Sequence, residues 1–352
     1  MNLIIFPESA SLKNGYGIAV DYGYDILSPA KDDLIVWYTD DATLPRFKNG
    51  DLWLHRPGWI SAKRIKNMLM NRVGPEVTVS DLSFLKGKIF DNIHCDDVIF
   101  YRALRKIFPN QHLTIRFHNC YARIQDRKEI LGMHLNVKFE INLLALTKLE
   151  REIFRDKNVH KIFLSEEDKG YYTSMTGRSD ASVWAFDMDI TKAVQNRTMT
   201  SFDNKLVWFG GVQDHKLRSI NWFIEEVFPL VVAEIPSVEF HLWGRDTKPF
   251  NNPDQNIFGH GIYTGNDIPL KDKALYVNPD IIGGGVKLKL KSYFEGGVPF
   301  ITTSFGFEGY NKDLLDGKYC IVSEMDKWAE TIITLLKNNN QHFPKKKITL
   351  SG

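Results

Sequence analysis

Short runs of apolar residues alternate with amphipathic stretches along the chain. The runs Leu3–Phe6, Leu34–Tyr38 and Leu113–Phe117 have the length of buried strands and are bounded by turn residues. Val98–Ile107 and Asn142–Arg155 instead carry apolar residues three or four positions apart, the spacing of helices that bury one face. Because strands and helices alternate in this way in both halves of the chain, we predict an α/β fold with parallel sheets.

The stretch Leu275–Gly309 contains the most informative set of these elements. A short apolar strand is followed by the glycine turn Gly283–Gly285 and by a predicted helix, Val286–Glu295. A helix that begins on glycines presents free N–H groups at its positive end, which favours an anion. Because the dipole contributes only about 0.3–2 kcal/mol, a diphosphate would also need the nearby Lys287 and Lys289. A solvated helix face with close glycine packing is the alternative.

The start of the chain has a related arrangement. The strand Leu3–Phe6 precedes a turn at Asn14–Gly17 and a predicted helix at Ile18–Leu27. In α/β proteins a strand, a glycine turn and a helix bring backbone N–H groups to a phosphate. We therefore consider Gly15 and Gly17 as candidate donor-binding residues, with ordinary loop glycines as the alternative.

A histidine follows the predicted strand Leu113–Phe117 directly. The carboxyl end of a parallel strand opens into the crevice where α/β sheets bind ligands. His118 is therefore a candidate to orient a sugar or pyrophosphate oxygen, or to act as an acid–base group. A purely structural histidine is the alternative.

Composition narrows the class of protein. The 352 residues suit two domains, and a net charge of +2 gives no support for a nucleic-acid partner. The cysteines Cys95, Cys120 and Cys320 fit neither a zinc spacing nor a disulfide framework, so we expect a reducing, cytoplasmic setting. No apolar run approaches the 18 residues of a membrane-spanning helix, and Leu3–Phe6 is too short for a signal peptide.

Ala62–Val73 predicts a basic amphipathic helix. One interpretation is an ordinary surface helix. The other is a peripheral contact with a lipid-linked or anionic acceptor at the inner face of the plasma membrane. The charges are Lys63, Arg64, Lys66 and Arg72, and the predicted apolar face is Ile65, Met68, Leu69 and Val73.

The glycine-rich stretch resembles the donor-binding segment of GT-B glycosyltransferases, close to the family 4 type (glycosyl transferases group 1). The matching positions, in the family's order and spacing, are Pro279, Gly283–Gly285, Lys287–Lys289, Gly297–Pro299 and Gly306–Gly309. The resemblance implies two Rossmann-like α/β domains facing an interdomain cleft. It assigns residues 1–195 to an acceptor-side domain, 196–340 to a nucleotide-sugar-binding domain and 341–352 to a basic tail, with a linker at Thr191–Asn204.

The resemblance also implies a set of site residues. His118, Lys287 and Glu308 are predicted to act in catalysis, and no metal ligand is predicted. The residues predicted to bind the donor are Gly15, Gly17, Gly210, Lys216, Arg245, Gly284, Gly285, Val286 and Lys289. Gly259–Gly261 is predicted to be the turn that begins the base-recognition loop.

The chain departs from the family pattern at two places. Retaining members carry two glutamates eight residues apart, and those positions are Gly284 and Ser292 here. The arginine that grips the donor diphosphate in many members is replaced by Gly211. Glu295 and Glu308 are the nearby carboxylates that can take over, and Glu308 matches the family's Gly-x-Glu-Gly turn.

By this resemblance we expect a glycosyltransferase that moves a sugar from a nucleotide-sugar of the UDP or GDP type to a glycan or lipid-linked acceptor. Retention of configuration, independence from metal ions and a role in bacterial surface polysaccharide assembly are part of the same expectation. Two alternatives stay open: a non-catalytic GT-B subunit that binds a glycan or a partner protein, which the missing glutamates favour, and a sugar-nucleotide epimerase of the same fold.

Overall fold

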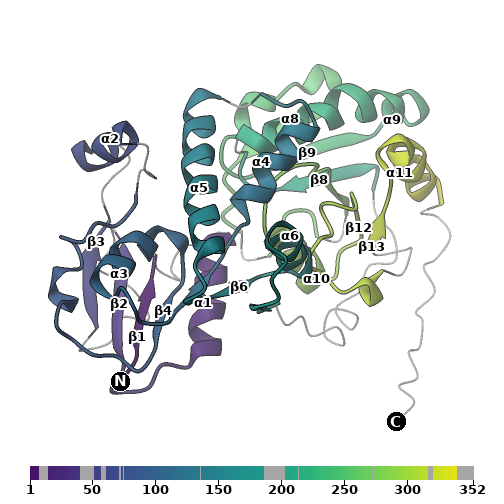
Figure 1. Ribbon diagram of the computed structural model, residues 1–352. Helices are drawn as coiled ribbons and strands as arrows, with labels where there is room; N and C mark the ends of the chain where they lie inside the picture. The colour runs from purple at the N-terminus through teal and green to yellow at the C-terminus, as the bar shows by residue number, and fades with distance from the viewer. Residues whose placement is uncertain are drawn as a thin grey trace, which may run out of the picture. The chain divides into compact units, whose positions relative to one another are not determined.

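The computed structural model divides into two compact units (Figure 1). The N-terminal unit consists of Met1–Phe186 together with Gly284–Val286, and the C-terminal unit of Asp187–Gly283 and Lys287–Gly352. The structure describes residues 1–7, 15–39, 51–56, 61–70, 73, 75–134, 136–185, 203–212, 214–265, 267–271, 273–315 and 320–338. The predicted linker at 191–202 and the predicted tail at 341–352 lie outside the described residues.

A parallel sheet forms the centre of the N-terminal unit. Within the described residues it has seven strands in the order β3-β2-β1-β4-β5-β6-β7. The strands are β1 (Leu3–Phe6), β2 (Leu34–Thr39), β3 (Leu52–His55), β4 (Ile93–Cys95), β5 (Leu113–Arg116), β6 (Val159–Phe163) and β7 (Ala181–Val183). The strand order reverses between β1 and β4, and α/β sheets bind ligands at the carboxyl ends of strands beside such a switch point.

Helices cover both faces of this sheet (Figure 1). They are α1 (Gly15–Leu27), α2 (Ala62–Leu69), α3 (Tyr101–Ile107), α4 (Tyr121–Ile130), α5 (Val137–Arg155) and α6 (Glu166–Thr176). Alternate residues of β1 enter opposite core clusters, Leu3 and Ile5 on one face and Ile4 and Phe6 on the other. This two-sided burial explains why the strands are continuous apolar runs.

The helix caps explain where two helices begin. Asn136 accepts a hydrogen bond from the Phe139 amide (2.9 Å), so α5 begins at Val137 and not at the predicted Asn142. Ser165 accepts one from the Asp168 amide (3.1 Å), so α6 begins at Glu166.

The C-terminal unit contains a second parallel sheet. Within the described residues it has six strands in the order β10-β9-β8-β11-β12-β13. The strands are β8 (Lys205–Phe209), β9 (Glu239–Trp243), β10 (Ile257–Gly261), β11 (Leu275–Asn278), β12 (Phe300–Thr302) and β13 (Cys320–Val322). The helices are α8 (Asp214–Trp222), the π-helical turn η3 (Phe223–Val227), α9 (Phe228–Glu234), α10 (Leu288–Gly296) and α11 (Trp328–Lys337).

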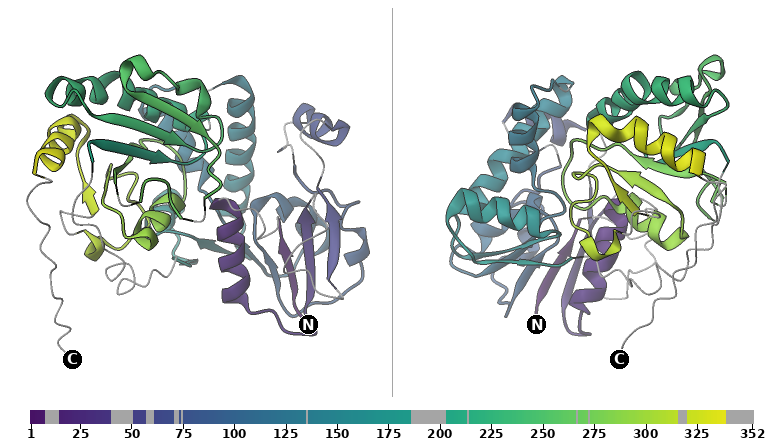
Figure 2. Two further views of the ribbon diagram at one scale, coloured as in Figure 1. Left: turned by 180° about the vertical axis from the view of Figure 1, so that it is seen from behind. Right: turned by 90° about the vertical axis from the view of Figure 1, so that its right-hand side faces the viewer.

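The two faces of the second sheet are covered by different helices (Figure 2). Apolar side chains of α8, α9 and α11 pack on one face, against Leu206 and Trp208 of β8. Those of α10 pack on the other face, against Val207 and Tyr276. In both units the predicted strands and helices are confirmed, so the α/β fold class with parallel sheets is correct.

Three local predictions are wrong. Gly15 and Gly17 lie in the first turn of α1 and not in a turn before it. Gly259–Gly261 is the end of strand β10, because its backbone pairs with β9. Helix α10 begins at Leu288 and not at the predicted Val286, because Lys287, its N-cap, has a ψ angle of 83° that a helix excludes.

Candidate functional site

A buried ion pair lies at the carboxyl end of strand β11. Asp280 follows this strand and is 1% exposed. Its Oδ1 accepts a hydrogen bond from Lys289 Nζ at 3.0 Å, and the Lys289 side chain is 8% exposed. The ammonium group of Lys289 also lies 4.9 Å from the centroid of the Trp208 ring. An ion pair with so little access to water is a strong local constraint on the glycine-rich loop between its two partners.

Two further lysines act on the same carboxylate. Burial alone would raise the pKa of Asp280, but the charges of Lys289, Lys216 and Lys287 outweigh it and hold the pKa below its ordinary value. Burial lowers the pKa of Lys289 to about 8, against the opposing effect of Asp280. The charges of three ammonium groups therefore act on one carboxylate, and these four side chains carry an excess of positive charge.

Lys287 is fixed by its neighbours. Its side chain is largely buried, and its Nζ lies 4.0 Å from the centroid of the Phe305 ring, within the range of a cation–π contact. Its carbonyl oxygen accepts a hydrogen bond from the Tyr310 hydroxyl at 2.9 Å. Because both the backbone and the ammonium group are held, Lys287 presents a positioned charge immediately before α10.

Hydroxyl groups hold the loop that carries Asp280. Ser219 of α8 accepts from the Ile281 amide at 3.2 Å. Thr303 donates to the Asp280 carbonyl and accepts from the Gly306 amide at 2.9 Å. The ends of β11 and β12 and the start of α8 are thus tied together around the lysines, while Asp280 Oδ2 has no hydrogen-bond partner within the described part of the chain.

Glycine turns meet at the carboxyl ends of β8, β9 and β10. The Gly210 amide donates to the Trp243 carbonyl at 2.9 Å, and the Gly244 amide donates to the Gly261 carbonyl at 2.7 Å. A Cβ atom at Gly244 would lie 1.8 Å from the Gly210 carbonyl oxygen, and its φ angle is 134°, so only glycine fits. Arg245 follows this contact and is exposed.

The predicted carboxylates occupy different environments. Glu308 lies in the turn after β12 and is half-buried, and its amide donates to the Phe305 carbonyl at 3.2 Å. The Glu295 side chain is 57% exposed and pairs with Lys291 one helical turn away. Glu308 shares its turn with Thr303 and Phe305, which contact Asp280 and Lys287 respectively, so it is the carboxylate nearer in sequence and structure to the lysines.

In the N-terminal unit, His118 is held by a buried acid. Its Nε2 lies 2.7 Å from the Asp96 carbonyl oxygen and 3.2 Å from Asp96 Oδ2. Arg116 donates to Asp96 Oδ1 at 2.7 Å, and both side chains are fully buried. Burial alone would raise the pKa of Asp96, but Arg116 and His118 lower it below its ordinary value. Asp96 therefore stays ionised and orients the His118 ring.

Helix α1 packs over this group. Arg116 donates to the Ala19 carbonyl at 2.5 Å, and a Cβ atom at Gly23 would lie 1.7 Å from an Arg116 nitrogen. His94 stacks on Trp184 with ring centroids 5.5 Å apart, and burial lowers the pKa of His94 to about 4. The ends of β4 and β5 thus carry a rigid, buried polar network beneath α1.

The glycine tripeptide grouped with this unit packs directly on the histidine loop. A Cβ atom at Gly285 would lie 2.4 Å from the His118 carbonyl oxygen, and one at Gly284 would lie 2.6 Å from the Ile124 side chain. With its amide oriented to satisfy both of its polar atoms, Asn119 donates to the Gly284 carbonyl at 3.0 Å. A side chain at position 284 would therefore require the Ile124 side chain to move, which gives a steric reason for that departure from the family pattern.

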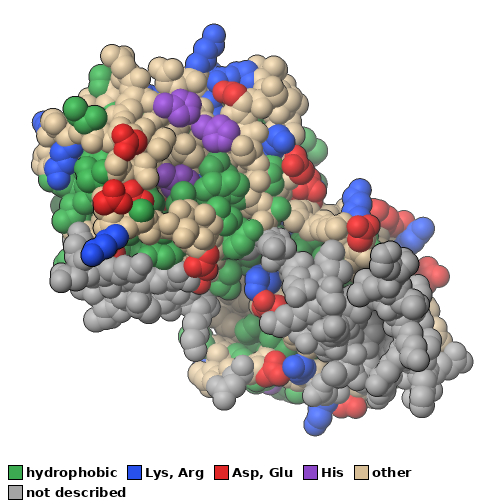
Figure 3. Space-filling model, turned by 90° about the horizontal axis from the view of Figure 1, so that it is seen from below, with side chains coloured by type: hydrophobic (Ala, Val, Ile, Leu, Met, Phe, Trp, Pro, Cys, Tyr) green, Lys and Arg blue, Asp and Glu red, His purple; other side chains and the backbone are tan. Residues whose placement is uncertain are grey.

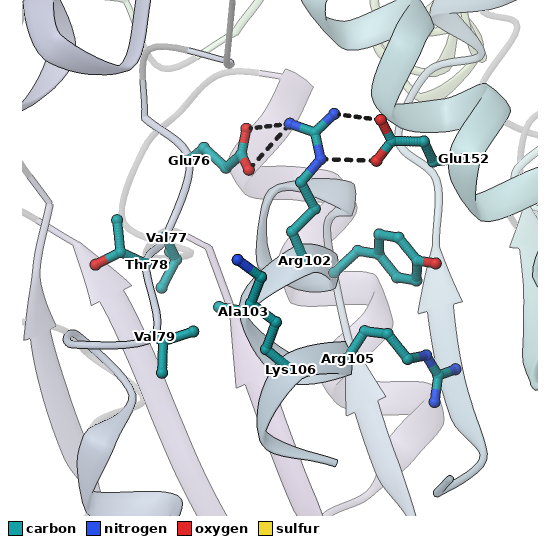
Figure 4. Close-up of a pocket in the computed structure, with 10 residues that line it drawn as sticks. Glu76, Val77, Thr78, Val79, Arg102, Ala103, Arg105, Lys106 and Glu152 are labelled. Carbon is teal, nitrogen blue, oxygen red and sulfur yellow. Dashed lines mark hydrogen bonds and ion pairs between the residues drawn. The ribbon is translucent and has the colours of Figure 1, made fainter. Parts of the chain in front are cut away.

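A hollow of about 290 Å³ lies elsewhere in the N-terminal unit (Figure 4). The guanidinium group of Arg102 of α3 pairs with two carboxylates. Its Nη1 lies 3.0 Å from Glu76 Oε2, and its Nε lies 2.7 Å from Oε2 of Glu152 of α5. Figure 4 shows the guanidinium group between the two carboxylates. Because these charges satisfy one another, the group serves as a structural junction between α3 and α5.

Several of these residues were missed by sequence reasoning. Asp280 was interpreted only as part of a turn, and Asp96, Arg116 and Trp208 were not predicted as site residues. The available signal was a polar residue directly after a buried strand, at Asn278–Asp280 and at Asp96.

The described residues contain no cluster of three His, Cys, Asp or Glu side chains able to hold a metal ion. Among the helices that are described, none is long and apolar enough to cross a bilayer.

Comparison with known sequences gives limited information. No protein-family model matches the chain. A curated protein of Klebsiella pneumoniae, named "Uncharacterized 44.6 kDa protein in cps region", is 24% identical over 138 residues. The match covers 35% of this chain and 34% of that protein, so it spans about a third of the relative's length.

Comparison with solved structures identifies the fold. WaaG, described as a glycosyltransferase involved in lipopolysaccharide biosynthesis, superimposes with a TM-score of 0.61 at 12% identity over 96% of this chain and 90% of WaaG. Sucrose-phosphate synthase from Thermosynechococcus elongatus gives 0.62 at 11% identity with the same coverage. TarM gives 0.54 at 17% identity, over 74% of this chain and 52% of TarM. The chain has the GT-B fold, with two parallel-sheet α/β units.

Proposed function

We propose that this protein is a glycosyltransferase that moves a sugar from a nucleotide-sugar to a glycan or a lipid-linked acceptor. The observation that carries the proposal is the buried ion pair of Lys289 and Asp280 beside a glycine-rich loop, on which the charges of Lys216 and Lys287 also act. The net positive charge of this group suits the diphosphate of a nucleotide-sugar. The GT-B fold supports the same activity.

In the proposed reaction, the lysines stabilise the charge that develops on the leaving diphosphate. Lys289 is held by Asp280 and acts mainly through its fixed position, whereas Lys216 and Lys287 supply charge to the phosphate oxygens. Arg245 and the glycine turn at Gly210, in the same unit as these lysines, are proposed to line the donor site. We further propose retention of configuration without a metal ion, and a nucleotide of the UDP or GDP type, on the basis of the sequence resemblance.

His118 is proposed to position the acceptor or the transferred sugar. Because Asp96 lies next to Nε2, the ring is held in one orientation at the carboxyl end of β5. Glu308 is proposed to contact the donor from the turn after β12. These roles rest on the resemblance together with the local contacts described above.

The setting is proposed to be surface polysaccharide assembly at the inner face of a bacterial plasma membrane. The relative from a cps region of Klebsiella pneumoniae supports this pathway. Helix α2 supports a peripheral membrane contact, because Ile65, Leu69 and Met70 are 53–82% exposed whereas Arg64 and Asn67 are buried. Within the predicted apolar face, Ile65 and Leu69 are thus turned toward solvent whereas Val73 is buried, and exposed apolar side chains beside basic ones suit a membrane surface.

A direct test measures nucleotide release from a panel of UDP- and GDP-linked sugars with extracted acceptor lipid. Lys287→Ala is expected to lower turnover about tenfold or more, since it removes a charge-assisted contact of about 1.5–3 kcal/mol. Lys271→Ala is the matched control, because Lys271 pairs with the exposed Asp267 in the same unit. Equal turnover of the two variants would remove Lys287 from the site.

A non-catalytic nucleotide-binding subunit is the second candidate. The observation that favours it is the absence of both family glutamates, at Gly284 and Ser292, with Ile124 packed closely on Gly284. Tight nucleotide binding without turnover of any donor would support this candidate over the enzyme. Interconversion of the nucleotide-sugar in the absence of an acceptor would instead indicate an epimerase.

A further inference from the structure

The hairpin of α4 and α5 exposes a group of apolar side chains at its tip. The two helices pack side by side and are joined by residues 131–136 (Figures 1 and 2). Five apolar residues at this end are between 41% and 83% exposed, although the helices bury their other apolar residues well. These five residues, called the hairpin tip below, are Ile130, Leu131, Val137, Ile141 and Leu144.

Basic residues continue the same face of α5. Residues 137, 141, 144, 148, 151 and 155 are separated by steps of three or four, so they form one stripe along the helix. The first three are apolar and the last three are Lys148, Arg151 and Arg155, all exposed and called the basic column below. The stripe therefore changes from apolar to cationic along the helix axis, and not around it.

The acidic groups beside the stripe are mostly engaged with other partners. Glu140 pairs with Lys128 across the hairpin, and Glu152 with Arg102. Glu129 accepts from Gln125 at 2.6 Å. Asp126 accepts from the Tyr171 hydroxyl at 2.6 Å and is 3.4 Å from Arg151. The basic column thus keeps a positive field, weakened only at Arg151.

A hollow of about 380 Å³ lies where the apolar and basic halves meet. Leu144 lines it from the apolar half and Lys148, Arg151 and Arg155 line it from the basic half. Thr147, Gln125, Glu129 and Glu152 complete the lining, and the two glutamates are engaged by Gln125 and Arg102. Basic and hydroxyl groups are those that bind a phosphate ester. On the face drawn in Figure 3, the described charged side chains of both signs are interspersed.

We propose that the hairpin tip docks on the surface of an anionic phospholipid bilayer. With a rise of about 1.5 Å per residue, Val137 lies about 10 Å beyond Leu144, and Lys148 about 6 Å behind it. Interfacial segments enter the boundary between headgroups and acyl chains by about 5–10 Å. If α5 meets the bilayer obliquely with its amino end first, the hairpin tip enters the boundary between headgroups and acyl chains. The basic column then lies beside the lipid phosphates.

This inference does not depend on the proposed sugar transfer. It names a second surface, separate in sequence from helix α2, and it requires no substrate. A protein partner is the competing occupant, but an apolar tip followed by cations along one axis matches the layered order of a bilayer, with acyl chains beneath phosphates.

The test is sedimentation of the full chain with vesicles of phosphatidylcholine containing about one third phosphatidylglycerol. Ile141→Ser/Leu144→Ser is expected to lower the bound fraction about fivefold or more, and Lys148→Glu/Arg155→Glu is expected to do the same. Ile89→Ser/Met175→Ser is the matched control, since both residues are exposed in the same unit but lie outside the hairpin. This control is expected to bind as the parent chain does, and pure phosphatidylcholine to bind weakly.

A fluorescent label gives an independent readout. Cys95, Cys120 and Cys320 are all buried, so a thiol probe reacts preferentially with Leu144→Cys or, as control, Met175→Cys. An environment-sensitive probe at 144 is expected to shift to the blue on anionic vesicles, and the probe at 175 to stay unchanged.

Three results would overturn the inference. One is binding of both hairpin variants at the level of the parent chain. Another is loss of binding only in Ile65→Ser/Leu69→Ser, which would assign the membrane contact to α2. The third is self-association or capture of a protein that the hairpin variants abolish, with vesicle binding absent throughout. Unchanged circular dichroism and thermal melting of each variant ensure that a loss of binding is not a loss of folding.

Discussion

The buried pair of Asp280 and Lys289 leads to a quantitative prediction for Asp280→Asn. The substitution keeps the size of the side chain but removes the charge that partners Lys289 at 3.0 Å. An ammonium group that is 8% exposed then has no carboxylate in contact, and Lys216 and Lys287 repel it. Removing one partner of a buried ion pair typically costs about 3–5 kcal/mol, so we expect the free energy of unfolding to fall by that amount at pH 7.

The sign of the pH dependence follows from the pKa of Lys289. The folded value of about 8 lies below the value of about 10.4 for an unfolded lysine. Between these two pH values the unfolded chain binds more protons than the folded chain, so stability rises with pH there. Asp280→Asn would lower the folded pKa of Lys289 further, which extends this window downward. The cost of Asp280→Asn should therefore shrink between pH 7 and pH 10.

Urea titrations of the full chain at both pH values measure this difference. The matched control is Asp267→Asn, which breaks the exposed pair between Asp267 and Lys271 at 2.9 Å and should cost no more than about 1 kcal/mol. Asp280→Asn/Lys289→Met should recover most of the loss, because no unpaired charge remains buried. If Asp280→Asn and Asp267→Asn cost the same at pH 7, the reasoning about burial is refuted.

Three other predictions follow from the same contacts. Asp96→Asn should lower turnover about ten- to hundredfold at unchanged nucleotide affinity, because it removes the carboxylate that orients the His118 ring. Equal losses in turnover and in nucleotide affinity would contradict this. The free energy of unfolding should fall by about 3 kcal/mol as pH decreases from about 6.5 to about 4, because His94 becomes protonated in the unfolded chain over that range but stays neutral in the folded chain. An acid titration of His94→Phe should show that this pH dependence is lost. Gly284→Glu, which restores the family residue, should collide with Ile124 and reduce the free energy of unfolding by about 1–3 kcal/mol. The melting temperature should fall accordingly, and an unchanged melting temperature would contradict the packing described here.

Much of the fold was predictable because it is encoded locally. Apolar runs such as Leu34–Tyr38 and Lys205–Phe209 are strands since both faces of a parallel sheet are buried. The glycine turn between β11 and α10 was also predictable, because positive φ angles favour glycine. Short strands with polar members, such as β4 with His94, were missed because their pairing depends on neighbours distant in sequence.

The candidate site was predictable only in part. Lys287 and Lys289 were identified by position, but their different roles were not. Lys289 is paired with Asp280 and Lys287 lies over Phe305, and no local pattern distinguishes the two. The predictions for Gly15 and Gly17 as a turn failed because α1 starts earlier than periodicity suggested.

The sequence by itself determined the element types, the α/β class and the glycine-rich turn before α10, since backbone preferences and the alternation of apolar residues act over a few neighbours. Tertiary structure alone decided which charges meet. Asp96, after β4, contacts Arg116 of β5 and His118, which follows it. Asp280 pairs with Lys289 of α10, and the charge of Lys216 of α8 acts on the same carboxylate. The solvent-facing stripe of α5 was decided in the same way, because burial of one helix face depends on what packs against it and not on the periodicity that forms the helix.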